Sequence, residues 1–548
     1  MTFQDIPHIP EDISVPQFIF GTHGIRPFRP ENVPWLVDDE TGVEFGGDQV
    51  KERTRSLSAG LQRRFGLKPD DVVVIFSGNH IDYPICIWAI QYFLGIVAPT
   101  NPGFTVPELT THLRSVKPSL VITHSEVLPT VENAMQQVGL TFERMVVIDA
   151  IESSGDSKYI SISELIQEGR SIPGPPVEYK LAPGENKKKI AFYNTSSGTT
   201  GSPKVVKISH YAAIANVLLT AAHNKVHVDY TAWEEKRYRV GNRCFAVLPF
   251  YHIYGLDVVL HFNIFAGLTI VIAPKFNFTN MLESIVRHRI THLMIVPPQV
   301  VLLCKDPVVK NYDLSGVRVV LCAGSALPGS TEVTGIASMC PITSKQNPHG
   351  GTFLPGVEGR VVRPDGSVVV AAPNDHEVGE LLIRTVSATA GYLDNEDATR
   401  ETFLEDGWIR SGDIVRIDTA GNIIVVDRVK EMIKVRSFQV APAELEGTIL
   451  DTVYADDACV VPVPDLYSGE LPLAYVVPSQ LAKEMIGRGE STEVRRGIIE
   501  HVARNKARFK HLARVEFVET IPKTPSGKIL RRDLRQRARE LVGGQAKL

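Results

Sequence analysis

The sequence predicts an α/β protein with a large N-terminal domain, residues 1–427, and a small α+β C-terminal domain, residues 428–548. Between residues 49 and 322, near-continuous apolar runs alternate with amphipathic stretches, which is typical of mostly parallel sheets covered by helices on both faces. From about residue 379 the strands become short and alternating, with turns such as Asp406-Gly407, so a small antiparallel unit is expected there. The last 48 residues carry 13 Lys+Arg against 4 Asp+Glu, which sets the C-terminal end apart.

Each element follows from its local pattern. Apolar runs predict buried strands, and apolar residues at helical spacing predict helices. In the large domain, the expected strands are 72–76, 119–123, 145–149, 189–193, 205–208, 244–249, 269–273, 292–296 and 317–322, with helices at 49–65 and 280–288. In the antiparallel unit, the expected strands are 380–384, 414–418 and 422–426. In the C-terminal domain, we expect a helix at 443–450, strands at 458–464 and 473–477, and a basic helix around 531–539.

Composition excludes several protein classes. Hydrophobic residues make up 43% and charged residues 22% of 548, which is ordinary globular composition rather than that of a disordered, collagen-like or coiled-coil chain. The net charge of −4, and the absence of a basic stripe interleaved with aromatics, give no expectation of nucleic-acid binding. The longest apolar run, 85–98, is shorter than the roughly 20 residues that cross a bilayer. Six widely spaced cysteines predict free, mostly buried thiols and no zinc site.

The two ends of the sequence bear on localisation. The acidic first 14 residues have no apolar core of the kind that a signal peptide needs. The chain finishes Ala546-Lys547-Leu548, close to the Ser-Lys-Leu address that a peroxisomal import receptor reads. We therefore expect that receptor as a partner and a peroxisomal location, or otherwise a cytoplasmic one.

The segment YNTSSGTTGSPKVV, residues 193–206, is the most informative part of the chain. Glycines let backbone N–H groups approach an anion, hydroxyls donate to phosphate oxygens, and Lys204 supplies positive charge. The spacing is not that of a Walker A motif. Strand-like runs on both sides predict a loop that is held at its two ends and binds phosphate.

This loop resembles the phosphate-binding signature of the adenylate-forming superfamily, which includes acyl- and aryl-CoA synthetases, luciferases and adenylation domains. Four further motifs resemble the family's in the same order: LPFYHIYGL (248–256), RSGDI (410–414), DRVKEMIKVRSFQVAPAELE (427–446) and KTPSGKILRRDLR (523–535). The likeness is strongest to 4-coumarate–CoA ligase-like enzymes. It implies an ATP-dependent carboxylate–CoA ligase that forms an acyl-AMP and then an acyl-CoA or aryl-CoA thioester, with ATP, Mg²⁺ and CoA as partners and a mobile C-terminal lid.

The resemblance also implies roles for individual residues. Lys528 would reach the carboxylate and the α-phosphate, and Asp413 would bind the ribose with help from Arg428. Asp427 would be the hinge, and Arg436 and Ser437 would contact CoA, with Ser437 standing where glycine is usual. Thr331 and Glu332 would contact phosphate and magnesium, with Glu332 as the metal ligand. The nucleotide contacts implied are Ser196, Ser197, Gly198, Thr199, Thr200, Gly201, Lys204, Asp413, Arg428, Lys430, Lys434 and Gln439.

The acid-binding side of the site rests on the second motif. By family position His252 would gate or orient the substrate carboxylate, although a histidine near apolar residues is more often part of the core. Amino-acid-activating domains usually place Asp at this position, so His252 favours an acid without an α-amino group. Tyr254, Ala326 and Met339 match acyl-pocket positions, and simple core packing is the alternative for each.

The family pattern breaks after Gly329. In the family, a helix and a strand ending in Gly-Tyr-Gly-Met-Thr-Glu follow the segment that resembles 317–327. Here only three residues precede Thr331; they span at most about 10 Å, whereas a parallel crossover takes a dozen or more residues. We therefore expect that a helix–strand segment is missing, leaving apolar surface and unpaired backbone exposed. Either a splice-model error or an isoform with impaired activity would account for it.

Three alternatives to a CoA ligase remain open. A stand-alone adenylation enzyme would load a carrier protein instead of CoA, and a luciferase-like oxygenase would share the first step. An inactive nucleotide-binding protein would result if the break abolishes catalysis.

Overall fold

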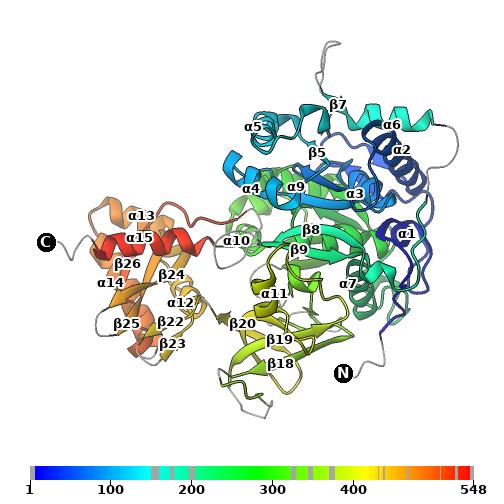
Figure 1. Cartoon of the computed structure of the whole chain (residues 1–548). Coiled ribbons are helices and arrows are strands. Elements are labelled where there is room, and N and C mark those ends of the chain that lie inside the picture. The colour runs from blue at the N-terminus through cyan, green and yellow to red at the C-terminus, as the bar shows by residue number, and fades with distance from the viewer. Residues whose placement is uncertain are drawn as a thin grey trace. The chain divides into compact units, whose positions relative to one another are not determined.

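The computed structural model describes residues 6–149, 159–172, 178–196, 204–322, 329–342, 350–363, 365–369, 377–429, 431–435, 438–465, 468–506, 508–524 and 529–543. The chain divides into two compact units (Figure 1). The first comprises residues 1–359 and 383–410, and the second comprises 360–382 and 411–548. A four-stranded sheet has the order β18 (Val357–Val362), β19 (Gly379–Thr385), β20 (Ile409–Ile417), β21 (Ile423–Arg428).

Two largely parallel sheets form the first unit, as predicted. The seven-stranded sheet has the order β7-β6-β5-β3-β4-β8-β9, and only β8 and β9 pair antiparallel. The six-stranded sheet has the order β13-β12-β10-β11-β1-β2, and only β1 and β2 pair antiparallel. The strands are β1 Leu36–Asp38, β2 Glu44–Phe45, β3 Val72–Phe76, β4 Ile96–Thr100, β5 Leu120–Thr123, β6 Met145–Val147, β7 Ile160–Ser161, β8 Ile190–Ser196, β9 Lys204–Ser209, β10 Arg243–Ala246, β11 Thr269–Ile272, β12 His292–Ile295 and β13 Val319–Cys322.

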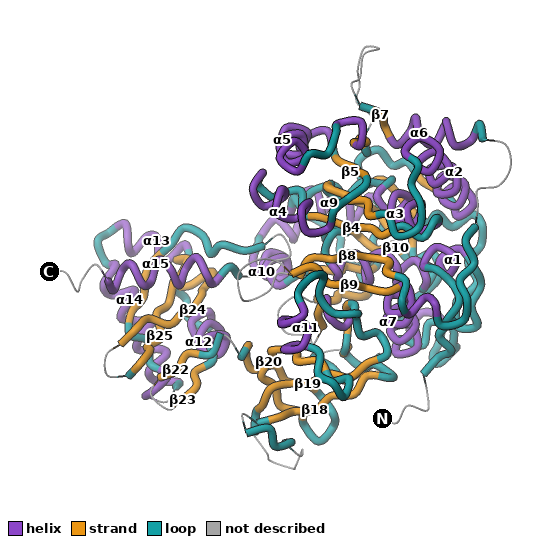
Figure 2. The backbone as a smooth tube through the Cα atoms, in the orientation of Figure 1, coloured by secondary structure: helices purple, strands orange, loops and turns teal. Residues whose placement is uncertain are grey.

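Helices cover these sheets because the strands are apolar on both faces. Val74 and Phe76 of β3 pack in one cluster with Leu109 of α4 and Met135 of α5. Successive strand residues point to opposite faces, so the equally buried Val73 faces the other side. Helices α2 and α6 lie side by side, and Figure 2 shows the strands between helices. The helices are α1 Val15–Phe20, α2 Gly47–Phe65, α3 Tyr83–Tyr92, α4 Val106–Val116, α5 Leu128–Val138, α6 Ile162–Arg170, α7 His210–His223, α8 Asn263–Phe265, α9 Phe278–Arg287, α10 Pro297–Lys305 and α11 Glu396–Thr402, with a π-helix, η6, at Tyr254–Phe262.

After β13 the chain forms short pairs rather than another long strand. β14 pairs antiparallel with β15, and β16 with β17. Between β14 and β15 lies a single 3₁₀ turn, η8, which contains Thr331 and Glu332. These elements are β14 Gly329–Ser330, η8 Thr331–Val333, β15 Gly335–Ile336, β16 Ser338–Met339, β17 Thr352–Phe353, β18 Val357–Val362 and β19 Gly379–Thr385.

The second unit is an α+β fold, as predicted. Its five-stranded sheet has the order β23-β22-β25-β24, with β26 joined to β25 in parallel. The core cluster contains Val460 and Val476 of the sheet, with Leu445 of α12 and Ile498 of α14. The elements are β20 Ile409–Ile417, β21 Ile423–Arg428, β22 Ile433–Val435, β23 Phe438–Val440, α12 Pro442–Leu450, β24 Ala455–Asp465, β25 Gly469–Pro478, α13 Gln480–Gly487, α14 Ser491–Asn505, β26 Arg514–Phe517 and α15 Arg531–Gly543.

The cysteines and the apolar helices bear on two expectations from the sequence. All six cysteines are free thiols, with Cys86, Cys244 and Cys459 buried but Cys304 exposed on α10. Among the residues that the structure describes, none of the helices combines the length and apolar character that crossing a bilayer takes.

Candidate active site

The predicted phosphate loop connects two strands of a hairpin. β8 and β9 pair antiparallel, with Ser196 opposite Lys204, so both ends of the loop are fixed on the sheet. Loop residues 197–203, with Ser197, Gly198, Thr199, Thr200 and Gly201, lie outside the described residues. The Ser196 hydroxyl is buried and has no hydrogen-bond partner within the described part of the chain. A buried hydroxyl without a partner is costly, which fits a position that meets a ligand.

The turn that carries His252 is held by two asparagine side chains. The buried Asn79 amide donates to the carbonyls of Ala246 and Leu248, at 3.2 and 3.0 Å, and accepts from the Phe250 N–H at 2.9 Å. Asn194 of β8 donates to the Tyr251 carbonyl at 3.2 Å. The phosphate-loop hairpin and the His252 turn are therefore joined by a direct hydrogen bond.

Glu332 is anchored by the segment that follows β19. The Tyr392 hydroxyl donates to Glu332 Oε1 at 2.9 Å, and the Thr389 N–H donates to the Glu332 carbonyl at 3.1 Å. The Lys204 ammonium lies 4.7 Å from the centre of the Tyr392 ring. Thr331 is buried beside Glu332, and η8 packs against β8. The structure thus brings Ser196, Lys204, Thr331 and Glu332 into one region of the first unit.

Two of the three predicted acyl-pocket residues are described, and both are buried. Tyr254, at the start of η6, donates its hydroxyl to the Leu321 carbonyl of β13 at 2.8 Å, and burial raises its pKa. Met339 accepts from the Asn224 amide at 3.1 Å through its sulfur. Ala326 lies outside the described residues. Packing alone accounts for the positions of Tyr254 and Met339, so their contact with an acid stays a prediction.

In the second unit, the predicted ribose-binding pair is close together. Asp413 of β20 lies opposite Arg428 of β21, and Arg428 Nε is 3.2 Å from Asp413 Oδ1. The carboxylate of Asp427 accepts from the N–H groups of Arg428 at 2.7 Å and of Ala443 at 3.0 Å. Ala443 lies in the first turn of α12, so Asp427 satisfies a helix N-terminus. Burial is the main cause that raises the pKa of Asp427 to about 6.

The lysine and CoA motifs are partly described. Lys434 of β22 lies opposite Gln439 of β23. Lys523 and Ile529 form an antiparallel bridge. Lys430, Arg436, Ser437 and Lys528 lie outside the described residues, so nothing follows here about their positions.

Arg531 lies within the lysine motif, at the start of the basic helix α15, and its side chain is 11% exposed. Its guanidinium pairs with both carboxylate oxygens of Glu446 and lies 2.6 Å from Glu431 Oε2. It also donates to the Val460 carbonyl at 3.2 Å. Burial would lower the pKa of Arg531, but hydrogen bonding to Glu446 outweighs it and raises the pKa further above its ordinary value.

β13 is the last strand on its side of the six-stranded sheet. Val320 of this strand is 55% exposed, and Val301 of α10, the helix that follows β12, is 43% exposed. Loss of a helix–strand segment after Gly329 would expose apolar residues in this way, and that loss stays a prediction.

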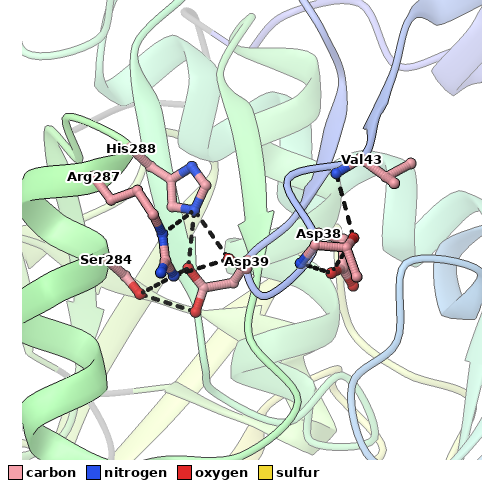
Figure 3. Close-up of polar contacts among 7 residues, drawn as sticks. Asp38, Asp39, Val43, Ser284, Arg287 and His288 are labelled. Atoms are coloured by element: carbon pink, nitrogen blue, oxygen red, sulfur yellow. Dashed lines mark hydrogen bonds and ion pairs between the residues drawn. The ribbon is translucent and has the colours of Figure 1, made fainter.

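Ser284, His288 and Asp39 form a polar group in the first unit with the residue types of a nucleophilic triad (Figure 3). The Ser284 hydroxyl donates to Asp39 Oδ2 at 2.9 Å, while His288 Nε2 lies 3.1 Å and Arg287 3.0 Å from Asp39 Oδ1. A nucleophilic serine needs a base to take its proton, but this hydroxyl is bonded to the carboxylate rather than to the imidazole. The group therefore ties α9 to the end of β1, a structural role.

Sequence reasoning missed four residues that organise this region: Asn79, Asn194, Asn216 and Tyr392. The Asn216 amide on α7 donates to the carbonyls of Val333 at 3.3 Å and Ile336 at 2.9 Å, on the two sides of the turn after Glu332. Asn194 stands within the segment 193–206 but received no role, and the other three lie outside the motifs. For Asn216, the apolar residues on both sides of a lone asparagine were the available signal, because a buried amide needs partners.

Comparisons with known proteins follow the same division of the chain. The model of the AMP-binding enzyme family matches residues 29–330, and that of the AMP-binding enzyme C-terminal domain matches residues 444–528. The chain is similar to the probable CoA ligase CCL5 of Humulus lupulus, with 32% identity over 91% of this chain and 89% of that protein. The peroxisomal OPC-8:0-CoA ligase 1 of Arabidopsis thaliana is also 32% identical, over 91% and 89%.

A third relative, acyl-CoA ligase EasD of Emericella nidulans, is 29% identical over 96% of this chain and 97% of its own. Among solved structures, the anthranilate CoA ligase AuaEII in complex with anthranoyl-AMP superposes with a TM-score of 0.81 at 22% identity, covering 99% of this chain and 100% of that one. At this identity, the structural likeness shows a shared fold and nothing more specific. Together with the two family matches, these relatives establish that the chain belongs to the AMP-binding enzyme family, among its ATP-dependent carboxylate–CoA ligases.

Proposed function

We propose that this chain joins a carboxylic acid without an α-amino group to CoA, through an acyl-AMP formed at the site around Ser196, Lys204 and Glu332. An acid oxygen attacks the α-phosphorus of ATP and pyrophosphate leaves; the CoA thiol then loses its proton, its sulfur attacks the acyl carbon, and AMP leaves. The observation on which the proposal rests is that Lys204 and Glu332 both contact Tyr392, at the base of the β8–β9 hairpin that carries the predicted phosphate loop.

The first step concentrates negative charge, so it depends on cations and oriented donors. Lys204 would neutralise phosphate charge at the base of the loop, and Lys528 would approach the reacting oxygens. His252, on a turn hydrogen-bonded to β8, would orient the acid, and Asp413 with Arg428 would hold the ribose. Burial of Tyr254 and Met339 supports an apolar wall for the acyl or aryl group.

Magnesium is the expected metal. Within the described part of the chain, no three His, Cys, Asp or Glu side chains are grouped as ligands. That suits magnesium, which keeps several waters and binds through one or two carboxylates together with phosphate oxygens. Glu332, with Thr331 beside it, would hold the ion. When bound, the ion would offset the negative charge of the phosphates.

The domain boundary and the location belong to the same proposal. We propose Asp427 as the hinge, so that residues 428–548 would act as the lid. In this lid Lys430, Lys434 and Gln439 would contact the nucleotide, and Arg436 and Ser437 would contact CoA. The terminal Ala546-Lys547-Leu548 supports a peroxisomal location, and one relative is named a peroxisomal ligase.

A second candidate is an isoform with impaired activity. The exposed edge at β13 favours it. This chain, and a version with a helix–strand segment inserted after Gly329, should each be tested for pyrophosphate release with a panel of acids, using CoA or a phosphopantetheine carrier as acceptor.

The outcomes separate the candidates. Release by both chains, with thioester formed on CoA, supports the ligase. Release by the extended chain alone identifies this chain as the impaired form. No release by either chain would end the ligase proposal, whereas thioester on the carrier alone would favour a carrier-loading enzyme.

A further inference from the structure

Tyr392 stands between the cation and the carboxylate of the proposed phosphate site. Its hydroxyl donates to Glu332 Oε1 at 2.9 Å, and the face of its ring receives the Lys204 ammonium at 4.7 Å. The two contacts use different parts of one side chain. Tyr392 therefore links strand β9, which begins at Lys204, to turn η8, which contains Glu332.

The position of Tyr392 is strongly fixed. The Leu393 N–H donates to the Val205 carbonyl at 2.8 Å and the Lys207 N–H to the Gly391 carbonyl at 2.9 Å, so residues 391–393 extend the sheet beyond β9. The ring packs edge-on against Phe403 of the same unit, with centroids 5.8 Å apart. With 5% of its surface exposed, Tyr392 has little freedom to move with its partners.

The arrangement keeps two opposite charges apart. Among the described residues, Lys204 makes no ion pair, although Glu332 contacts the same tyrosine. An ammonium over an aromatic face is held by the ring quadrupole and keeps its charge available to an incoming anion.

We propose that Tyr392 is a positioning residue of the phosphate site: its hydroxyl orients Glu332 toward magnesium, and its ring holds Lys204 toward the phosphates of ATP. The inference rests on the proposed function and adds to it a residue that the sequence motifs do not mark. A hydrogen bond to one oxygen of a ligating carboxylate fixes the direction of the other, and loss of such a bond lowers metal affinity. Tyr392 does not touch the reacting atoms in this account.

The two parts of the side chain can be removed separately. Tyr392→Phe deletes the hydroxyl but keeps the ring, its packing on Phe403 and its face for Lys204. Tyr392→Leu deletes the ring as well. Tyr211 on α7 offers a matched control, because Lys187 lies 4.9 Å from its ring centre, away from the proposed site.

The readout is ATP binding by calorimetry, with Mg²⁺ or with EDTA, on the full chain and without acid or CoA. For Tyr392→Phe we expect about tenfold weaker ATP binding with Mg²⁺ and unchanged binding with EDTA. For Tyr392→Leu we expect a further loss of about fivefold that is also present with EDTA, because Lys204 is no longer held. Tyr211→Phe and Tyr211→Leu should match the unchanged chain in both conditions.

The pattern distinguishes the inference from the function on which it rests. If the unchanged chain binds ATP and Tyr392→Phe binds it equally well with Mg²⁺, the positioning role of the hydroxyl is refuted. If Tyr392→Phe weakens binding equally with and without Mg²⁺, the effect is general structural damage and the inference fails. An unchanged chain that binds no ATP would overturn the proposed function, and the inference with it.

Discussion

Arg531 provides the sharpest test of how the second unit is held together. Its side chain is 11% exposed and lies between Glu431 and Glu446, with hydrogen bonds also to the carbonyl of Val460. Glu446 in turn accepts from the Val460 N–H at 2.7 Å. One guanidinium therefore joins the turn after β21, helix α12, strand β24 and the start of α15.

Arg531→Met keeps most of the length of the side chain but removes the charge between the buried Glu446 and the largely covered Glu431. Removing one partner from a buried ion pair costs about 3–5 kcal/mol, chiefly because the remaining charges stay desolvated and unpaired. With a urea dependence of about 2 kcal/mol per molar, the unfolding midpoint of the second unit should fall by roughly 2 M. Arg532→Met is the matched control, because Arg532 is the next residue and is exposed.

The two units can be followed independently in this assay. All four tryptophans, Trp35, Trp88, Trp233 and Trp408, lie in the first unit, so tryptophan fluorescence reports its unfolding. Hydrogen exchange of peptides from 431–465 and 531–543 reports the second unit. We expect a large shift in exchange and a small one in fluorescence. A shift no larger than that of Arg532→Met would refute the argument from buried charge.

Three further predictions concern the Asp39 group, Asp427 and the edge strand β13. Burial would raise the pKa of Asp39, but hydrogen bonds from His288, Ser284 and Arg287 lower it overall, so its stabilising effect is present above about pH 4 and lost as pH falls further. Asp39→Asn should lower the free energy of unfolding at pH 7 by about 1–3 kcal/mol. Denaturant unfolding of the variant and of the unchanged chain from pH 2 to 7 measures this. A difference between the two that does not shrink on acidification would contradict the prediction. Asp427 has a raised pKa of about 6, so the folded state should gain stability as pH falls from above 6 toward about 4, the pKa of an aspartate in the unfolded chain. Asp427→Asn should remove that part of the pH dependence, which hydrogen exchange of peptides from 423–450 would measure. Val320→Lys should reduce aggregation on warming, followed by light scattering, with little loss of stability because the side chain is half exposed; equal aggregation would show that this edge is not the cause.

Local patterns predicted the fold well because most of its elements are strongly apolar or amphipathic. The strands at 72–76 and 292–295 and the long helix α2 are visible as periodic runs, and the change to short alternating strands after residue 379 marks a real change in architecture. The π-helix η6 was not predicted: its residues are all buried, so no amphipathic period distinguishes it from a strand.

Residues of the candidate site could be predicted from the sequence only where they belong to a contiguous motif. The hairpin around the phosphate loop, and the pairing of Asp413 with Arg428, follow from contiguous segments. Asn79 holds carbonyls more than 160 residues away, and Tyr392 meets Glu332 across 60 residues. Such contacts depend on the tertiary fold, and a single sequence contains no local signal for them. For Arg531 the charge pattern was misleading, because a basic helix is usually solvated and this arginine is buried.

The same long-range contacts bear on whether the short connection after Gly329 destroys the site. A crossover shortened as the sequence predicts would remove the support that a neighbouring strand gives to Thr331 and Glu332. In this structure the turn is fixed from other directions: Asn216 holds the carbonyls of Val333 and Ile336, and Tyr392 holds Glu332. Asn216 lies on α7 and Tyr392 lies between β19 and α11, so both are far along the chain from Gly329. We therefore expect the short connection after Gly329 to affect the solubility of the chain, through the exposed Val320 of β13, more than its hold on phosphate.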